Sequence, residues 1–334
     1  MGSEKSGPAE QRRYAVAFPS AREADRRVAG VAAAARVVHD LAESGAGEIW
    51  LTIGDGAVPL APATLADIER LRAASEVRVV APADAPADIV PTPAPSLHAM
   101  DILRATTKPG DGLVSRWFNR PISQRISWLV LLIPGARPIH ATIASAAFAV
   151  VMFFGMLGGG KAGLMLGGIL FQAASVLDGV DGEMARATFR ATDFGKTLDS
   201  ALDMATNVLF VLALTIHLGR HGPHHVAWLG YWSLGLMTTG AVLIGWRTRA
   251  GGAPLSFDLL KRSGPVRNLF DLVFWTVQTL SSRDCFAFLF MVLIILGLAH
   301  VALGIFASVG TVWIVYVVGS LLLPRPRAGY RGAA

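Results

Sequence analysis

The segment DGVDGEMARATFRATDFGKTLDSALD, residues Asp178–Asp203, places four aspartates between two long apolar runs. We expect one membrane helix to end in this segment, a short basic turn to follow and a second membrane helix to begin. Asp178 and Asp181 are three residues apart, so they project from one face of the first helix. Asp199 and Asp203 are four residues apart and share a face of the second helix. Two antiparallel helices would therefore bring the four carboxylates together.

Four carboxylates close together near a bilayer repel one another, and each is costly to desolvate. A divalent cation would compensate this charge. All-oxygen ligation favours Mg²⁺, Mn²⁺ or Ca²⁺ over zinc. The sequence has one cysteine, Cys285, which excludes a thiolate metal cluster and an intramolecular disulfide. A paired-metal site with ions about 4 Å apart would suit transfer at phosphorus.

Composition indicates a membrane protein with a small soluble part. Of the 334 residues, 53% are hydrophobic and only 16% are charged, which is too apolar for a uniformly soluble chain. The apolar runs lie in residues 139–323, whereas residues 1–100 carry mixed charge. The net charge of +6 would be compatible with nucleic acid, but in membrane proteins basic residues usually mark cytoplasmic loops and anionic headgroups. We therefore predict no nucleic-acid partner.

Six apolar segments are long enough to be predicted as membrane spans, the last being the shortest. They are residues 139–157, 163–186, 195–218, 225–246, 284–306 and 308–323. The external loops of this arrangement hold only Lys161 and Arg220, while the other side is rich in arginine and lysine. No secretory signal opens the chain. We expect an integral protein of a bacterial-type inner membrane, with both termini and the acidic site facing the cytosol.

The soluble part is predicted to be a parallel α/β domain. Strands are expected at residues 13–20, 47–54 and 77–81, and helices at 21–44 and 65–74. The predicted division is a disordered tail (1–12), the α/β domain (13–82), a Pro/Ala-rich linker (83–97) and a membrane domain (98–334) that opens with an interfacial helix near 112–132. The fold class is an α-helical membrane protein, a six-helix bundle preceded by a small cytosolic α/β domain.

The acidic segment resembles the signature of the CDP-alcohol phosphotransferase family. Asp178-x-x-Asp181-Gly182-x-x-Ala185-Arg186, then eight residues, then Gly195-x-x-x-Asp199-x-x-x-Asp203 matches this signature at every fixed position. The resemblance extends over roughly residues 105–323. It implies a transferase of phospholipid biosynthesis that moves a phospho-alcohol, such as a phosphatidyl group, from a CDP-linked donor to a hydroxyl acceptor and releases CMP. It also implies a homodimer.

The resemblance implies a role for each aspartate. Asp178, Asp181 and Asp199 would hold two Mg²⁺ or Mn²⁺ ions that neutralise charge on the leaving CMP. Asp203 would help to hold metal or, as we favour, act as general base on the acceptor hydroxyl.

On the donor side, the resemblance places Gly182, Ala185 and Gly195 beside the cytidine and ribose. Arg186 would lie near the phosphates or pair with an acid. Many family members have Pro-Asn-x-x-Thr at the start of the first span, where this chain has Pro-Ile-His-Ala-Thr at residues 138–142. Thr142 is thus retained as a donor contact, and the asparagine is missing.

The sequence from Lys108 to Ser123 resembles the arm that precedes the first span of inositol-phosphate-using members of the family. Such members accept a phosphorylated polyol, so the site would need cations. The candidates are Arg190, Lys196, Arg247, Arg249 and Arg283. Each could equally be an anchor on the cytoplasmic side of the membrane.

Residues Ala24–Gly54 resemble the early helix and second strand of nucleotidyltransferases that make sugar or inositol nucleotides. The first strand ends in Phe18-Pro19-Ser20 and lacks the Gly-x-Gly-Thr-Arg loop that cradles a nucleotide triphosphate. About 100 residues is also too short for that fold. We interpret the domain as a degenerate remnant with a structural or regulatory role.

Two alternatives come from other functional classes. Acids in membrane spans often mark ion pathways, so an ion or proton transporter is one, although no paired repeat or broken helix supports it. A non-catalytic family relative that acts as a scaffold is the other, and the four intact aspartates argue against it.

Overall fold

The computed structural model describes residues 12–108, 111–222, 224–250 and 282–322, with positions 268, 276, 279 and 280. The predicted tail, apart from Arg12, lies outside these residues. The chain forms two compact units. The α/β unit comprises the residues up to Thr106 with Ser127–Ala136 and Glu183–Arg190. The helical unit comprises Thr107–Ile126, Arg137–Gly182 and the residues from Ala191 onward.

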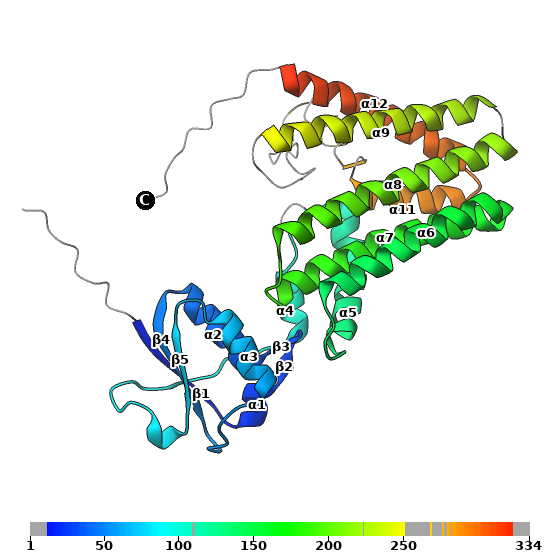
Figure 1. Cartoon of the computed structure of the whole chain (residues 1–334). Helices are drawn as coiled ribbons and strands as arrows, with labels where there is room; N and C mark the ends of the chain where they lie inside the picture. The colour runs from blue at the N-terminus through cyan, green and yellow to red at the C-terminus, as the bar shows by residue number, and fades with distance from the viewer. Residues whose placement is uncertain are drawn as a thin grey trace, which may run out of the picture. The chain divides into compact units, whose positions relative to one another are not determined.

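A parallel sheet forms the centre of the α/β unit (Figure 1). Its strands are β1 (Arg12–Phe18), β4 (Ala46–Ile53), β5 (Glu76–Val80) and β6 (Thr92–Pro93), in the order β5-β4-β1-β6. Every neighbouring pair is parallel, as the alternation of strands and helices predicted. β4 is the most buried strand, because Ile49, Leu51 and Ile53 have no exposed surface.

The helices of this unit differ from the prediction in one place. They are α1 (Ala21–Asp25), α2 (Ala33–Glu43), α3 (Pro62–Leu71) and α4 (Ala99–Ala105). The prediction of one helix over residues 21–44 was wrong, because a hairpin of β2 (Arg27–Val28) and β3 (Val31–Ala32) separates α1 from α2. Ala29 and Gly30 form its turn with φ of 46° and 82°, a left-handed conformation that a helix cannot contain.

The predicted linker contains regular structure. A short 3₁₀ turn, η1, covers Pro82–Asp84, and β6 joins the edge of the sheet beside β1. The Thr92 hydroxyl donates to the Ala15 carbonyl at 3.2 Å, and the Ala94 N–H donates to the Ala17 carbonyl at 2.9 Å. Proline is tolerated here because the outer side of an edge strand needs no N–H donor.

Long apolar helices make up the helical unit, and among the residues that the structure describes four helices are long and apolar enough to cross a membrane. These are α6 (Pro138–Gly158), α7 (Gly160–Ala187), α8 (Asp193–His221) and the Val226–Leu243 part of α9 (His224–Ala250). The remaining elements are a π-helical turn, η2 (Ser115–Asn119), followed by α5 (Arg120–Leu131), and then α11 (Arg283–Ile295) and α12 (Ala299–Leu322). α8 packs against α6 and α9, and α9 packs against α12 (Figure 1).

The predicted span over 284–306 is wrong in its bounds. The helix breaks after Ile295 and resumes at Ala299. Gly297 has φ of 77°, and the Leu298 N–H donates back to the Leu293 carbonyl at 2.7 Å, which closes α11 with a left-handed glycine. The apolar run continues through this break, so hydropathy alone placed the end of the helix too late.

A cluster of phenylalanines fixes α7, α8 and α11 beside one another. Phe171 of α7 stacks on Phe210 of α8 with ring centroids 3.9 Å apart. Phe286 and Phe290 of α11 lie against these rings at 5.8 and 5.2 Å. Phe171 and Phe210 are fully buried. These contacts hold the three helices on which the acidic site is built.

Candidate metal and substrate site

Three of the four predicted aspartates meet between α7 and α8. Asp178, Asp199 and Asp203 each offer one carboxylate oxygen, and these oxygens lie within 4.8 Å of one another. Only residues 188–192 join the two helices, so α8 returns directly beside α7. Thr192 caps α8, because its hydroxyl accepts from the Gly195 N–H at 3.0 Å. The spacing of the acids and the short turn together produce the cluster.

Asp181 lies one helical turn beyond Asp178 and is 7% exposed. Its Oδ2 accepts a hydrogen bond of 2.7 Å from the hydroxyl of Thr142, near the start of α6. Thr142 was predicted to contact the donor, and the structure places it behind an aspartate. A hydroxyl behind a metal-binding carboxylate fixes the orientation of that carboxylate and so strengthens metal binding.

Thr142→Val is expected to weaken Mn²⁺ binding by about 10- to 100-fold, as loss of a partner behind a metal ligand usually does. Valine keeps the shape of the side chain and removes the donor to Asp181. The binding constant can be measured by electron paramagnetic resonance of free Mn²⁺. Thr215→Val is the matched control, because the Thr215 hydroxyl is also buried but donates to the Val211 carbonyl of its own helix. Equal affinities for the two variants would contradict the role of Thr142.

Arg283, the first residue of α11, lies among the acids. Its Nη1 is 3.0 Å from Asp178 Oδ1 and also donates to Asp203 Oδ1. Its Nε and Nη2 are buried and have no hydrogen-bond partner among the described residues. A buried guanidinium with unsatisfied donors is costly unless an anion completes it. Arg283 therefore neutralises part of the acidic charge and still offers two donor groups.

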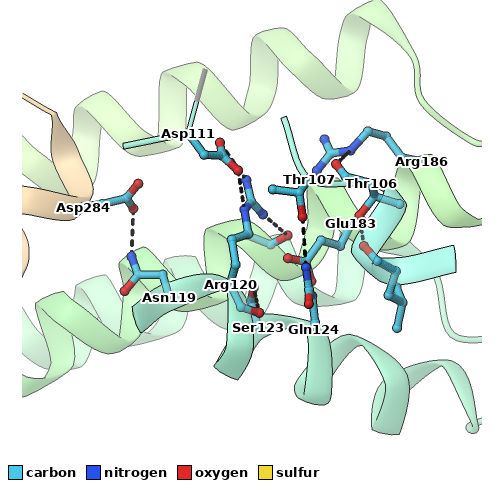
Figure 2. A network of polar contacts seen from close by, with 12 residues as sticks. Thr106, Thr107, Asp111, Asn119, Arg120, Ser123, Gln124, Glu183, Arg186 and Asp284 are labelled. Carbon is cyan, nitrogen blue, oxygen red and sulfur yellow. Dashed lines mark hydrogen bonds and ion pairs between the residues drawn. The ribbon is translucent and has the colours of Figure 1, made fainter. Parts of the chain in front are cut away.

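A polar network that the sequence did not reveal holds the start of α11 (Figure 2). Asp284 Oδ1 accepts from the Asn119 amide at 2.8 Å and from the Ser175 hydroxyl at 3.0 Å. Gln172 donates to Asn119 Oδ1 at 2.7 Å. This network fixes Asp284, and thereby its neighbour Arg283, against α7. Asn119 belongs to the predicted arm, and Asp284 follows the predicted cation Arg283. These neighbouring predictions were the only features of the sequence that could have pointed to the two residues.

The arm packs closely on α7 beside the acids. Arg120 donates to Asp111 at 2.7 Å, and both side chains are largely buried (Figure 2). The Arg120 Nη1 also lies 3.5 Å from the Gly179 carbonyl. A Cβ at Gly179 would stand 3.2 Å from Arg120 Nη1 and from the Ser123 hydroxyl, so a larger residue would crowd the arm at this point. Gly179 thus serves helix packing.

The donor set fits a hard divalent cation. The cluster of Asp178, Asp199 and Asp203 offers only carboxylate oxygens, which Mg²⁺ and Mn²⁺ prefer. Asp178 and Asp203 retain 26% and 28% of their side-chain exposure, so an ion could reach them. These residues could therefore hold metal.

The other predicted donor contacts lie along the same two helices. Gly182 and Ala185 are half-buried on α7, and Gly195 is exposed in the first turn of α8. Arg186 donates from Nε to the Thr106 carbonyl at 3.0 Å. All four follow or precede the acids by a few residues, so their proximity to the site comes from the helices themselves.

The predicted acceptor cations separate into three groups. Arg283 contacts the acids directly. Arg190 and Lys196 are exposed in and after the turn between α7 and α8, and Lys196 pairs with Asp193 at 2.9 Å. Arg247 and Arg249 belong to α9, but their side chains lie outside the described residues. Among the candidate cations whose side chains the structure describes, Arg283 is the one that contacts the carboxylate cluster.

Comparison with known proteins gives a family match. Residues 137–332 match the family described as CDP-alcohol phosphatidyltransferase. This stretch contains α6 to α12 and all four aspartates.

Three curated relatives illustrate the similarity. A "Bifunctional IPC transferase and DIPP synthase" of Aquifex aeolicus is 40% identical over 111 residues, 33% of this chain and 24% of that protein. One of the same description from Thermococcus kodakarensis is 33% identical over 160 residues, 48% of this chain and 34% of that protein. An "Archaetidylinositol phosphate synthase" of Methanothermobacter thermautotrophicus is 32% identical over 102 residues, 30% of this chain and 47% of that protein. The chain thus spans a quarter to about half of these relatives.

Proposed function

The chain belongs to the CDP-alcohol phosphatidyltransferase family, and we propose that it transfers a phospho-alcohol group from a CDP-linked donor to a hydroxyl acceptor and releases CMP. The product would enter phospholipid synthesis. The observation that carries the proposal is the cluster of Asp178, Asp199 and Asp203 around Arg283, whose Nε and Nη2 have no partner among the described residues. Such a site combines oxygen ligands for a cation with donors for an anion.

The proposed reaction breaks the phosphoanhydride bond of the CDP-linked donor and forms a phosphoester bond to the acceptor. Asp203 takes the proton of the acceptor hydroxyl, whose oxygen then bonds to the phosphorus next to the donor's alcohol. The bond from that phosphorus to the bridging oxygen breaks, and CMP leaves with the electron pair. Asp178, Asp181 and Asp199 would hold Mg²⁺ or Mn²⁺, which supplies positive charge beside the pyrophosphate when bound. Thr142 orients Asp181 throughout.

A phosphorylated polyol such as inositol phosphate is the acceptor that we favour. One of the relatives named above is described as an archaetidylinositol phosphate synthase. Arg283 has two buried N–H-bearing nitrogens without a partner among the described residues, and guanidinium groups bind phosphate well. Arg190 and Lys196 would add positive charge at the cytosolic end. The nucleotide of the CDP-linked donor would lie beside the predicted donor-binding residues Gly182, Ala185, Arg186 and Gly195.

The proposed setting is a bacterial-type inner membrane. The six spans of the sequence prediction would comprise the four described helices that are long and apolar enough to cross it, the 24-residue α12 and the shorter α11 of 13 residues. The arginines and lysine near the turn between α7 and α8 support a cytosolic site and cytosolic termini. Several α6 side chains are exposed and apolar, including Ile143, Val150 and Phe154, so this surface could face lipid or a second copy in a homodimer.

The test is release of CMP by the purified chain in lipid nanodiscs. CDP-diacylglycerol and other CDP-alcohols are offered with inositol phosphate, glycerol phosphate or a lipid alcohol, and the product is identified by mass. We expect CMP release with Mg²⁺ or Mn²⁺. Chelation should lower the rate of CMP release by at least about a thousandfold, because without the metal the negative carboxylates and the negative pyrophosphate repel one another. Readdition of either ion should restore it.

Two results would contradict the proposal. Transmembrane ion flux in proteoliposomes without CMP formation would favour a transporter. Binding of CDP-alcohol without turnover for any acceptor would favour a non-catalytic scaffold.

A further inference from the structure

The turn between the two aspartate-bearing helices enters the core of the α/β unit. This turn, residues 188–192, follows the last residue of α7 and precedes the first residue of α8. Phe189 has φ of 55°, an uncommon conformation for a bulky residue that surrounding contacts must hold. Its side chain packs against the apolar core around α2 and the sheet. Its ring centroid lies 3.9 Å from that of His39.

Arg36 of α2 connects this core to the end of α7. The residue is 4% exposed, and burial lowers its pKa to about 10, so it is charged at neutral pH. Nε donates to the Val28 carbonyl at 2.8 Å, and Nη2 donates to the Ala29 carbonyl at 2.9 Å. Nη2 also donates to the Ala187 carbonyl at 2.6 Å. That carbonyl is one of the last of α7 and has no partner within the helix, so a cation is favourable there.

Arg36 and Arg70 make further contacts with the same turn. The Arg36 guanidinium lies 5.3 Å from the centre of the Phe189 ring, a cation–π distance. Arg70 of α3 donates to the carbonyls of Thr188 and Phe189 at 3.2 and 3.3 Å. Two arginines of the α/β unit therefore donate hydrogen bonds to three consecutive carbonyls, those of residues 187–189.

The β2–β3 turn has the shape that this contact requires. Gly30 has φ of 82°, which favours glycine. A Cβ there would come within 2.8 Å of the Leu131 side chain and 3.1 Å of the Thr188 methyl. The neighbouring carbonyls of Val28 and Ala29 accept hydrogen bonds from Arg36. The hairpin that interrupts the predicted helix therefore holds this arginine in place.

We propose that the α/β unit is a positioning device for the metal site, in which Arg36, with Arg70, fixes residues 187–189 and thereby the relation of Asp178 on α7 to Asp199 on α8. The inference rests on the proposed function and assigns a role to the N-terminal α/β domain, for which the sequence predicts a structural or regulatory role. Asp199 lies ten residues after Phe189 and is connected to it by the rest of the turn and the first residues of α8. A shift of about 1 Å between groups that must act together can cost about a hundredfold in rate.

The test uses the full-length chain in nanodiscs with Arg36→Ala, Arg36→Lys and Arg70→Ala. We expect Arg36→Ala to raise hydrogen exchange of the amides of residues 188–192 and to weaken Mn²⁺ binding about tenfold or more. The kcat for CMP release should fall by about 10- to 100-fold, with less than a threefold change in KM for the donor. Arg36→Lys should not restore these values, because an ammonium cannot hold three carbonyls in a planar fork.

The matched control is Arg78→Ala. Arg78 also stacks over an aromatic ring, that of Trp50 at 4.9 Å, but it is 47% exposed and its ion-pair partners are Glu48 and Glu76, not residues of the turn. It should resemble the wild type in exchange, Mn²⁺ binding and kcat. If Arg36→Ala fails to fold, Arg70→Ala provides the same comparison from a more exposed position.

The outcomes separate this inference from the proposed function. Unchanged exchange and unchanged Mn²⁺ affinity in folded Arg36→Ala and Arg70→Ala would overturn the positioning role, even if the wild type releases CMP. A wild type that releases no CMP, combined with increased exchange and weaker Mn²⁺ binding in the variants, would overturn the proposed reaction and leave the positioning role in place.

Discussion

Asp199→Ala and Asp203→Asn are each expected to reduce CMP release by at least about a thousandfold, the size of effect seen when a central charge-stabilising or proton-transferring group is lost. Asp199 and Asp203 lie on one face of α8, and both contribute an oxygen to the carboxylate cluster. Asp203→Asn keeps the shape of the side chain but removes its charge and its ability to take a proton. Initial rates of CMP release under saturating donor and acceptor are the measurement.

Metal binding distinguishes the roles of these two aspartates. If Asp199 is a ligand, Asp199→Ala should weaken Mn²⁺ binding by at least about tenfold. If Asp203 is chiefly the base, Asp203→Asn should lose turnover while its Mn²⁺ affinity stays within about threefold of the wild type. A large loss of Mn²⁺ affinity in Asp203→Asn would instead make it a ligand, and the search for the base would move to another group.

Asp101→Asn is the control for this series. Asp101 is 66% exposed on α4, where it pairs with Arg104 at 3.3 Å, and exposed pairs of this kind contribute little. It should keep wild-type rates. Wild-type rates in Asp199→Ala or Asp203→Asn as well would sink the mechanism.

The features that sequence predicted best depend on fixed periods. The intervals of three and four residues at Asp178, Asp181, Asp199 and Asp203 place carboxylates on helix faces wherever the helices run, and the structure gathers three of the four. The parallel order of the α/β unit likewise follows from alternating strands and helices. Such patterns are local or repeat regularly, so they can be recognised in the sequence without knowledge of tertiary contacts.

The features that sequence missed depend on tertiary contacts. Arg36 sits in an alanine-rich helix and looks like an ordinary surface charge, yet it is buried against the end of α7. Asn119 and Asp284 are 165 residues apart, and no spacing rule relates them. The break after Ile295 occurs inside a continuous apolar run, where hydropathy gives no sign of a glycine in a left-handed conformation.

The number of membrane spans and the domain boundaries stay predictions. In the described part of the chain four helices satisfy the length and hydropathy of a span, and the count of six needs α11 and α12 as well. β6, which pairs with β1, lies within the stretch predicted as a linker, and composition gave no sign of this strand.

Arg283→Gln is expected to move two measured quantities in opposite directions. Removing a cation beside three carboxylates removes electrostatic repulsion toward a metal ion, so Mn²⁺ should bind more tightly, by about three- to tenfold. The same change removes the buried guanidinium that would meet the acceptor phosphate. A charge-assisted hydrogen bond contributes about 1.5–3 kcal/mol, so KM for the acceptor should rise by about 10- to 100-fold.

The metal-free protein provides the third measurement for Arg283. Its Nη1 contacts both Asp178 and Asp203, and its side chain is 13% exposed, so its loss leaves acids close together without their counter-ion. The metal-free variant should lose on the order of 3 kcal/mol of stability, and added Mn²⁺ should recover most of that loss. Arg283→Lys keeps the charge and should show a smaller change in all three quantities.

Arg220→Gln is the matched control, since Arg220 lies at the far end of α8, is exposed and has its Nη1 3.4 Å from the Leu157 carbonyl. It should leave Mn²⁺ affinity and acceptor KM unchanged. If Arg283 were only a structural counter-ion, Mn²⁺ binding would tighten in Arg283→Gln while KM for the acceptor stayed at its wild-type value. If Arg283 contacted the acceptor without influencing the metal, KM alone would rise. Only a joint change, in which Mn²⁺ binds more tightly and KM for the acceptor rises, fits one guanidinium that compensates the charge of the aspartates and also binds the acceptor phosphate beside them.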